Sequence, residues 1–116
     1  MATETMNAQT RERLLSSLGL CAKAGKLIYG VPMICDAMRG RRERLVVLCA
    51  ADNAANSTKK LTDKCRFYGA ELLTLPVDGE ELARAVGKTA RLAAVAVTDE
   101  NLVRLVKKHL GQTENE

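Results

Sequence analysis

Apolar residues recur along the chain with two different periods, and their alternation predicts the order of the secondary-structure elements. Two stripes have the i, i+4, i+7 spacing that is typical of one helix face, namely Leu14, Leu18 and Cys21 and, later, Leu61, Cys65 and Tyr68. Uninterrupted apolar runs at 45–51 and 92–97 instead predict strands that are covered on both faces. Shorter runs at 27–29 and 72–75 predict two further strands.

Helix breakers and capping residues divide the rest of the chain into five predicted helices. Gly25, Gly40 and Gly69 follow helical patterns, where glycine commonly ends a helix. Pro32 suits a first helical turn, because the N–H that it lacks would have no partner there. The capping candidates are Asp52, Asn53, Asn56 and Ser57 for the third helix, Asp78 with Glu81 as a capping box for the fourth, and Thr98 or Asp99 for the last.

The alternation of helices and strands implies a largely parallel or mixed sheet with helices on both faces. We therefore predict an α/β fold, a three-layer α/β/α sandwich with a mixed sheet of about four strands. The 116 residues are enough for one core and not for two. We assign 9–111 to a single domain and expect loose tails at 1–8 and 112–116.

The charge balance favours anionic partners. Lys and Arg number 18 against 14 acidic residues, which gives a net charge of +4 and a pI of about 9.0. Acidic residues gather in the C-terminal tail and around 78–81, so the rest of the surface is more basic than the net charge indicates. This balance is a mild indication of a polyanion such as nucleic acid.

The cysteines and the N-terminal residues indicate the compartment. The widely spaced cysteines all lie in apolar patterns: Cys21, Cys35, Cys49 and Cys65. No pair has the short spacing of a zinc or redox site, so we predict buried, reduced thiols and no metal or cofactor. Residues 1–10 lack the apolar core of a signal peptide, and no apolar run is long enough to span a membrane. We therefore expect a soluble cytoplasmic protein with no membrane partner.

Candidate catalytic groups are few. The one histidine, His109, lies near the C-terminal end of the last predicted helix, where a cation is favourable. The sequence has no Gly-x-Ser-x-Gly elbow and no metal-binding histidine pair. Asp52 and Asp99 follow predicted strands, where α/β enzymes often place acids, but each also precedes a helix that it can cap. We predict no catalytic residues and a protein that is not an enzyme.

Glycine-containing turns are the candidates for binding an anion. Gly25-Lys26 and Gly87-Lys88 each place a lysine at a chain reversal, and they form one cationic edge if the fold brings them together. Each pair alone is also typical of a helix C-cap with a solvated lysine. The turn at Gly30 and Pro32 opens a helix whose free N–H groups form an anion site, with Lys23 upstream. A basic stretch either ends that helix in solvent or extends a phosphate-tracking face: Arg39, Arg41, Arg42 and Arg44.

Several segments together resemble a known family. They are Lys23-Ala24-Gly25-Lys26-Leu27-Ile28-Tyr29-Gly30, the helix to Arg39-Gly40, the strand Leu45 to Cys49, Asn56-Ser57-Thr58-Lys59-Lys60, Asp63-Lys64-Cys65 and Val86-Gly87-Lys88-Thr89-Ala90-Arg91. Taken in order, they resemble the ribosomal L7Ae/L30e kink-turn RNA-binding family, and most of all its small bacterial ribosomal-protein-like branch. The resemblance spans residues 11–110, almost the whole chain.

The resemblance implies the same α/β/α sandwich and an RNA partner. Family members bind kink-turns, internal loops whose tandem sheared G·A pairs bend the RNA sharply, and act without catalysis in ribosomes or other ribonucleoproteins. The start of the second helix enters the groove at the G·A pairs and a later loop covers an extruded nucleotide; here these regions are 30–36 and 88–92. We expect a monomer that binds a kink-turn or ribosomal RNA. The expected RNA-binding residues are Lys23, Lys26, Gly30, Val31, Pro32, Met33, Lys88, Thr89, Ala90 and Arg91.

The sequence departs from the family pattern at the start of the second helix. Typical members have an Asn-Glu pair there and a lysine four residues after the Asn, whereas this chain has Pro32, Met33 and Asp36. A good bidentate base contact contributes about 1–3 kcal/mol, so the departure is expected to weaken kink-turn binding. The alternative function is a ribosome- or ribonucleoprotein-associated scaffold that has lost kink-turn specificity and binds protein or RNA through its basic edge.

Overall fold

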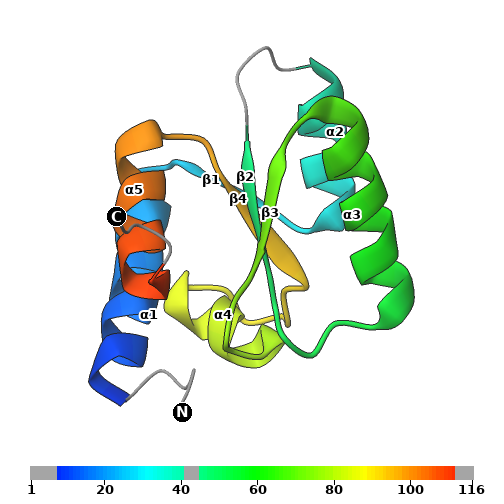
Figure 1. Ribbon diagram of the computed structural model, residues 1–116. Coiled ribbons are helices and arrows are strands. Elements are labelled where there is room, and N and C mark those ends of the chain that lie inside the picture. The colour runs from blue at the N-terminus through cyan, green and yellow to red at the C-terminus, as the bar shows by residue number, and fades with distance from the viewer. Residues whose placement is uncertain (1–7, 41–44, 112–116) are drawn as a thin grey trace.

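The computed structural model describes residues 8–40 and 45–111 (Figure 1). Its helices are α1 (Ala8–Lys23), α2 (Val31–Gly40), α3 (Ala55–Tyr68), α4 (Gly79–Ala85) and α5 (Glu100–Leu110). Its strands are β1 (Leu27–Tyr29), β2 (Val46–Cys49), β3 (Glu71–Thr74) and β4 (Ala94–Val97). The predicted tails lie outside the described residues, apart from Ala8, which begins α1. Arg41, Arg42 and Arg44 of the basic stretch lie outside them as well.

The four strands form one mixed sheet in the order β1-β4-β2-β3. Strands β2 and β3 are parallel, with Val46 opposite Glu71. Strand β4 lies antiparallel between β1 and β2, so that Val97 faces Leu27 on one side and Val46 on the other. The predicted mixed sheet of four strands is confirmed.

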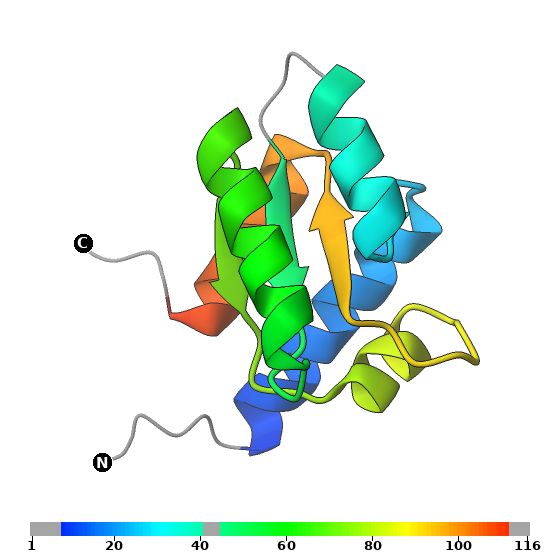
Figure 2. The same cartoon turned by 90° about the vertical axis from the view of Figure 1, so that its right-hand side faces the viewer.

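The helices cover both faces of the sheet, α1, α4 and α5 on one face and α2 and α3 on the other (Figures 1 and 2). Side chains of a strand alternate between the faces, so Val95 and Val97 of β4 pack with the first group of helices and Ala94 and Ala96 with the second. All four residues of β2 and all four of β4 are buried. The apolar runs are uninterrupted because both faces of these central strands are covered, and the predicted three-layer sandwich is confirmed.

Most helix ends follow the predicted chemistry. Asp78 and Glu81 form the capping box of α4, each side chain accepting from the other residue's backbone N–H. Asp99 caps α5 by accepting from the backbone N–H of Leu102. Gly69 ends α3 with a φ of 74°, in the left-handed region that favours glycine. The cap of α3 was predicted wrongly, because the N-cap is Ala54, without a side-chain hydrogen bond.

Two strands are shorter than predicted, and α2 continues through Gly40. Leu92 and Ala93, which we assigned to β4, lie in the preceding loop, although the Ala93 carbonyl still accepts from the Ala50 N–H at 2.9 Å, next to the last β2–β4 pair. The N–H of Leu92 donates to the carbonyl of Gly79, 3.1 Å away. The Ala93 carbonyl accepts from the Asn53 side chain at 2.8 Å.

All four cysteines are free. Cys21, Cys49 and Cys65 are buried as predicted, while Cys35 is half-buried on α2. Burial raises the pKa of the Cys21 and Cys65 thiols to about 11, so both are protonated at neutral pH. Within the described residues, no helix is long and apolar enough to cross a membrane.

Candidate nucleic-acid interface

The first turn of α2 is an open helix N-terminus at the end of β1. Gly30 has a φ of 83°, and its N–H donates to the Ala94 carbonyl at 3.0 Å, which fixes the turn to the first residue of β4. Because α2 begins at Val31, the N–H groups of Val31 and Met33 have no carbonyl acceptor within the helix. Pro32 is exposed, and Met33 is 60 % exposed. The turn therefore offers backbone donors, and an apolar side chain lies beside them.

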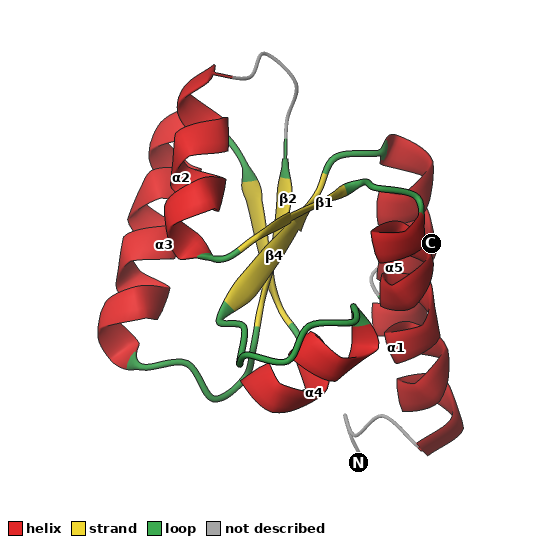
Figure 3. Cartoon of the chain, turned by 180° about the vertical axis from the view of Figure 1, so that it is seen from behind, coloured by secondary structure: helices red, strands yellow, loops and turns green. Residues whose placement is uncertain are grey.

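The segment 87–93, here called the 87–93 loop, passes from α4 to β4 below the sheet, near the start of α2 (Figures 2 and 3). It begins at Gly87, whose φ of 80° lies in the left-handed region. The hydrogen bonds of Leu92 and Ala93 described above tie its far end to α4 and to the segment before α3. The loop is thus held at its base, and its outward residues are exposed: Lys88, Thr89 and Ala90.

The Arg91 side chain anchors the 87–93 loop to Asp52. Its guanidinium donates to the Asp52 carboxylate at 2.7 Å and to the Asp52 carbonyl at 3.1 Å. The same carboxylate accepts the N–H of Gly79 at 3.0 Å, so Asp52 joins the loop to the start of α4. A Cβ at Gly79 would lie 2.7 Å from Arg91 Cγ, so a larger residue there would displace the Arg91 side chain from this position. Asp52, which we considered as an α3 cap, is therefore an anchor of the 87–93 loop.

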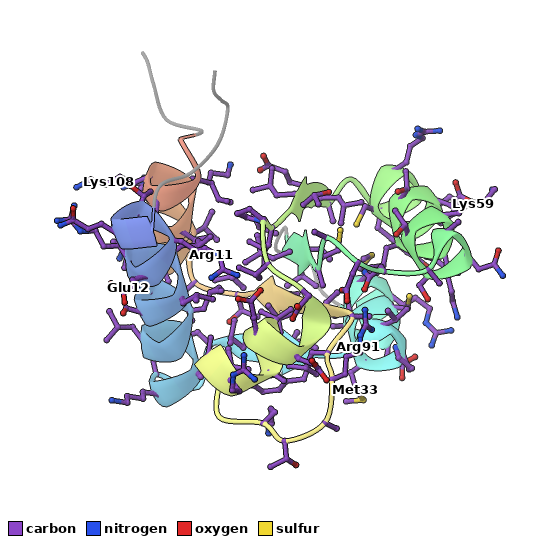
Figure 4. All side chains as sticks on the ribbon, turned by 90° about the horizontal axis from the view of Figure 1, so that it is seen from below. Arg11, Glu12, Met33, Lys59, Arg91 and Lys108 are labelled. Atoms are coloured by element: carbon purple, nitrogen blue, oxygen red, sulfur yellow. The ribbon has the colours of Figure 1, made fainter. Side chains whose placement is uncertain are left out.

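A cation–π contact joins the loop to β1. The Lys88 ammonium lies 4.4 Å from the centre of the Tyr29 ring, a favourable position because the face of the ring is electron-rich. Tyr29 immediately precedes Gly30, so this contact places the cation beside the α2 turn. The structure thus brings the start of the 30–36 region and the 88–92 region together, and with them the expected residues 30–33 and 88–91. Figure 4 views the molecule from this side, with Met33 on α2 and Arg91 on the loop labelled.

The expectation that the two glycine–lysine pairs meet at one edge is wrong. The Lys26 carbonyl accepts from the Thr98 N–H at 3.0 Å and from its hydroxyl at 3.2 Å. These bonds place Gly25-Lys26 where β4 ends, whereas the Tyr29 end of β1 lies opposite Val95 near the start of β4. The turns before β1 and after β4 lie together at one end of the sheet and the 87–93 loop at the other (Figure 3). Lys26 lines a groove of about 650 Å³ with Asp99 and Glu100.

Lys23 lies nearer to the 87–93 loop than its place in the sequence indicates. It is exposed and lines a groove of about 610 Å³ between α1 and α4 with Ala85. Ala85 precedes Gly87 by two residues, so the groove that Lys23 lines lies close to the beginning of the loop. Among the predicted residues, Lys26 is therefore the one that the fold places at the far end of the sheet.

Two lysines that we did not predict extend the surface along α3. A groove of about 260 Å³ separates α2 from α3, and Pro32, Cys35, Asp36, Arg39, Lys60 and Lys64 line it. Asp36, which stands where family members have a lysine, forms an ion pair with Arg39 of its own helix. The i, i+4 spacing of Lys60 and Lys64 was a usable signal for a common helix face, but nothing in the sequence placed α2 opposite them.

The architecture and the site together define a class: a compact α/β/α domain with an open helix start beside a loop of small residues and lysine. A model of the ribosomal protein L7Ae/L30e/S12e/Gadd45 family matches residues 12–106. The chain belongs to this family, as the motifs in its sequence indicated.

Relatives and solved structures agree with this assignment. A curated relative, the RNA-binding protein YlxQ of Bacillus subtilis, is 38 % identical over 87 residues, which are 72 % of this chain and 80 % of the relative. A YlxQ from Enterococcus faecium is 28 % identical over 90 residues, 78 % and 85 % of the two chains. A Bacillus halodurans protein of unknown function superposes with a TM-score of 0.75 at 28 % identity, covering 84 % of this chain and 96 % of that one. The 15.5kD RNA binding protein of Giardia lamblia shares the fold, with a TM-score of 0.70 at 19 % identity and coverages of 96 % and 92 %.

Proposed function

We propose that this protein binds structured RNA of the kink-turn type through the start of α2 and the 87–93 loop. One observation carries the proposal: the Lys88–Tyr29 contact and the Gly30–Ala94 hydrogen bond hold these two segments together in one exposed surface. Family membership and the names of the YlxQ relatives support RNA as the partner. We call this surface, comprising 30–33 and 88–91, the binding edge.

The residues of the binding edge have separate roles in this proposal. The free N–H groups of Val31 and Met33 and the Lys88 ammonium meet phosphate oxygens, which orients the RNA without reading its sequence. Thr89 and Ala90 are small and exposed, so an unstacked base can approach the backbone there. RNA is read largely through such distortions of shape and through backbone contacts.

Arg91 has a different role in the proposal from the one the sequence implied. Its side chain is 43 % exposed, but the guanidinium is bonded to Asp52. We propose that it holds the 87–93 loop in the binding conformation and that its remaining N–H groups face the RNA. Lys26 is the weakest member of the predicted set, because Asp99 and Glu100 line the same groove.

The proposal includes no catalytic step, no metal and no cofactor, and it places a monomer in the cytoplasm, either in the ribosome or as a free factor. A gel-shift titration tests it with a kink-turn RNA and with a version whose two G·A pairs are converted to Watson–Crick pairs. We expect clearly tighter binding of the kink-turn. Equal affinity for both RNAs would contradict kink-turn recognition and leave electrostatic association only.

The second candidate function is the scaffold. It is favoured by Met33, whose side chain is 60 % exposed where typical members carry a glutamate. An exposed apolar side chain beside open helix donors can also dock on a protein surface. Failure of both RNAs to bind, together with co-purification of the protein with ribosomal particles, would favour this function.

A further inference from the structure

The end of α3 carries an aromatic pair that the core does not use. Phe67 is 79 % exposed and Tyr68 is 37 % exposed, although the chain has only three aromatic residues. Their ring centres are 4.8 Å apart and the ring planes meet at 85°. This edge-to-face contact is a favourable aromatic geometry, and it leaves most of the surface of Phe67 open to solvent.

Phe67 continues a row of lysines along α3. Lys60, Lys64 and Phe67 are spaced i, i+4, i+7, so they share one stripe of the helix. The two lysines line the groove between α2 and α3, which reaches Pro32 at the binding edge. Phe67 lies about 10 Å beyond Lys60 along the helix axis, given a rise of about 1.5 Å per residue. The stripe therefore connects the binding edge to the aromatic pair.

The charge of this groove is cationic. Among the described residues, Lys60 and Lys64 form no ion pair, whereas Lys59 on the outer side of α3 (labelled in Figure 4) is bonded to Asp63 at 2.8 Å. The one carboxylate in the groove, that of Asp36, is already paired with Arg39. Two unpaired ammonium groups are therefore available to a polyanion between the binding edge and Phe67.

We propose that the Lys60–Lys64–Phe67 stripe binds a single-stranded segment that flanks the structured RNA. A base of this segment stacks on the Phe67 ring, while Lys60 and Lys64 neutralise its phosphates. Cationic grooves that carry exposed aromatic rings bind single strands in this way, because every base has a face that can stack. The inference rests on the proposed function, since RNA docked at the binding edge supplies the strand.

The alternative occupant of the stripe is a protein. Lysine is depleted in protein–protein interfaces relative to the remaining surface, whereas two unpaired lysines here share a stripe with the aromatic ring. A protein that covered Phe67 would also have to desolvate or pair these ammonium groups, whereas a nucleic-acid strand supplies a phosphate for each. The charge thus favours RNA.

The test compares a blunt-ended kink-turn RNA with two versions that carry a short single-stranded extension, one at the 5′ end and one at the 3′ end. We expect one extension to tighten binding by the wild-type protein about 5-fold or more, the range of one stacked base. Phe67→Ala should abolish this gain and bind the blunt RNA as wild type does, and Phe67→Tyr should keep it. Leu20→Ala is a matched control, because Leu20 is also a large exposed apolar residue, 53 % exposed, on α1.

The lysines have their own expected result in the same assay. Lys60→Gln with Lys64→Gln should reduce the gain from the extension and flatten its dependence on salt concentration, because two phosphate contacts are removed. Lys59→Gln is the control on the same helix. The stripe is wrong if neither extension tightens wild-type binding, or if Phe67→Ala keeps the full gain. Affinities that Phe67→Ala leaves unchanged for every RNA would rule out stacking of a base on this ring.

A second readout separates this inference from the proposed function. The chain has no tryptophan and two tyrosines, so in a Tyr29→Phe variant the tyrosine emission reports on Tyr68 alone. A single-stranded oligonucleotide should quench this emission, and Phe67→Ala should remove the quenching. Quenching without kink-turn binding would contradict the proposed function but support strand binding by the stripe. Kink-turn binding without quenching would contradict strand binding by the stripe but support the proposed function.

Discussion

The two glycine–lysine pairs of this chain have the same residues and opposite surroundings. Gly25-Lys26 lies where β4 ends, in a groove that contains Asp99 and Glu100. Gly87-Lys88 lies at the other end of the sheet, with its ammonium on the Tyr29 ring and the open start of α2 beside it. The comparison shows that the same two residues at a helix end can lie beside carboxylates or beside helix donors and an aromatic ring, depending on where the fold places them.

The largest expected effect comes from restoring the polar pair at the start of α2, which lies at the same end of the sheet as Lys88. Pro32→Asn with Met33→Glu restores the polar pair that family members carry, and each good base contact contributes about 1–3 kcal/mol. We expect kink-turn affinity to rise at least about 10-fold in a gel-shift titration. Met33→Ala, which removes the exposed side chain and adds no acceptor, is the control. A restored pair that brings no gain would show that this surface reads RNA differently from the rest of the family.

The next prediction tests the two lysines directly. Lys88→Ala removes one phosphate contact, so kink-turn affinity should fall about 5- to 8-fold at 0.1 M salt and the salt dependence should become shallower by about one contact. Lys26→Ala is the matched variant and should change both quantities much less, because two carboxylates lie in its groove. Equal losses for the two variants would refute the distinction between the two ends of the sheet.

A smaller effect is expected from removing Asp52, which anchors the 87–93 loop. Asp52→Ala removes the partner of Arg91 and the acceptor for Gly79 N–H, so the loop should open more often. We expect a loss of stability of about 1 kcal/mol, discounted because both side chains are nearly half exposed. RNA affinity should fall a few-fold because the loop must be ordered again on binding.

Native-state hydrogen exchange checks this prediction at both ends of the sheet. The Leu92 amide, bonded to Gly79 within the loop, should exchange faster in Asp52→Ala, and the Thr98 amide, bonded to Lys26, should not. Asp63→Ala is the control, since it breaks an aspartate ion pair on α3, away from the loop. Faster exchange at Thr98 as well would mean that Asp52 acts through global stability.

Much of the fold was predictable because its signals are local. The two apolar periods, the capping box at Asp78 and the glycine after α3 each depend on residues within a few positions of one another. The start of α2 and the exposed part of the 87–93 loop were predictable for the same reason, since breakers and small residues mark both. The family motifs then supplied the pairing between these two segments.

The rest of the site depends on contacts between distant residues. Arg91 and Asp52 are separated by 39 positions. Arg91 was expected to bind RNA and Asp52 to cap a helix, and no local pattern indicated that they pair. The position of Lys26 depends on β4 running antiparallel to β1, and the apolar runs do not encode strand direction. Lys60 and Lys64 appeared in the sequence only as members of the family motifs, and no local pattern placed α2 opposite them.

The smallest expected effect tests the electrostatics at the Lys26 end. Asp99 raises the pKa of the buried Cys21 thiol, second to burial itself. Asp99→Asn removes the charge and keeps a side chain that caps α5 well. The Cys21 pKa should therefore fall below about 11, but it should stay above 9.0 because burial persists. Thiolate absorbance during an alkaline titration measures this shift, with Cys21→Ala identifying the signal.

The same substitution has a consequence for stability with a definite sign. The folded-state pKa of Cys21 is raised above 9.0, so the unfolded chain loses this proton first as the pH rises. The contribution of the thiol to stability is present below pH 9 and is lost as the pH rises toward 11. Asp99→Asn should make that loss shallower and leave kink-turn affinity unchanged. If it instead raised kink-turn affinity as much as Lys88→Ala lowers it, the Lys26 end would be part of the RNA surface.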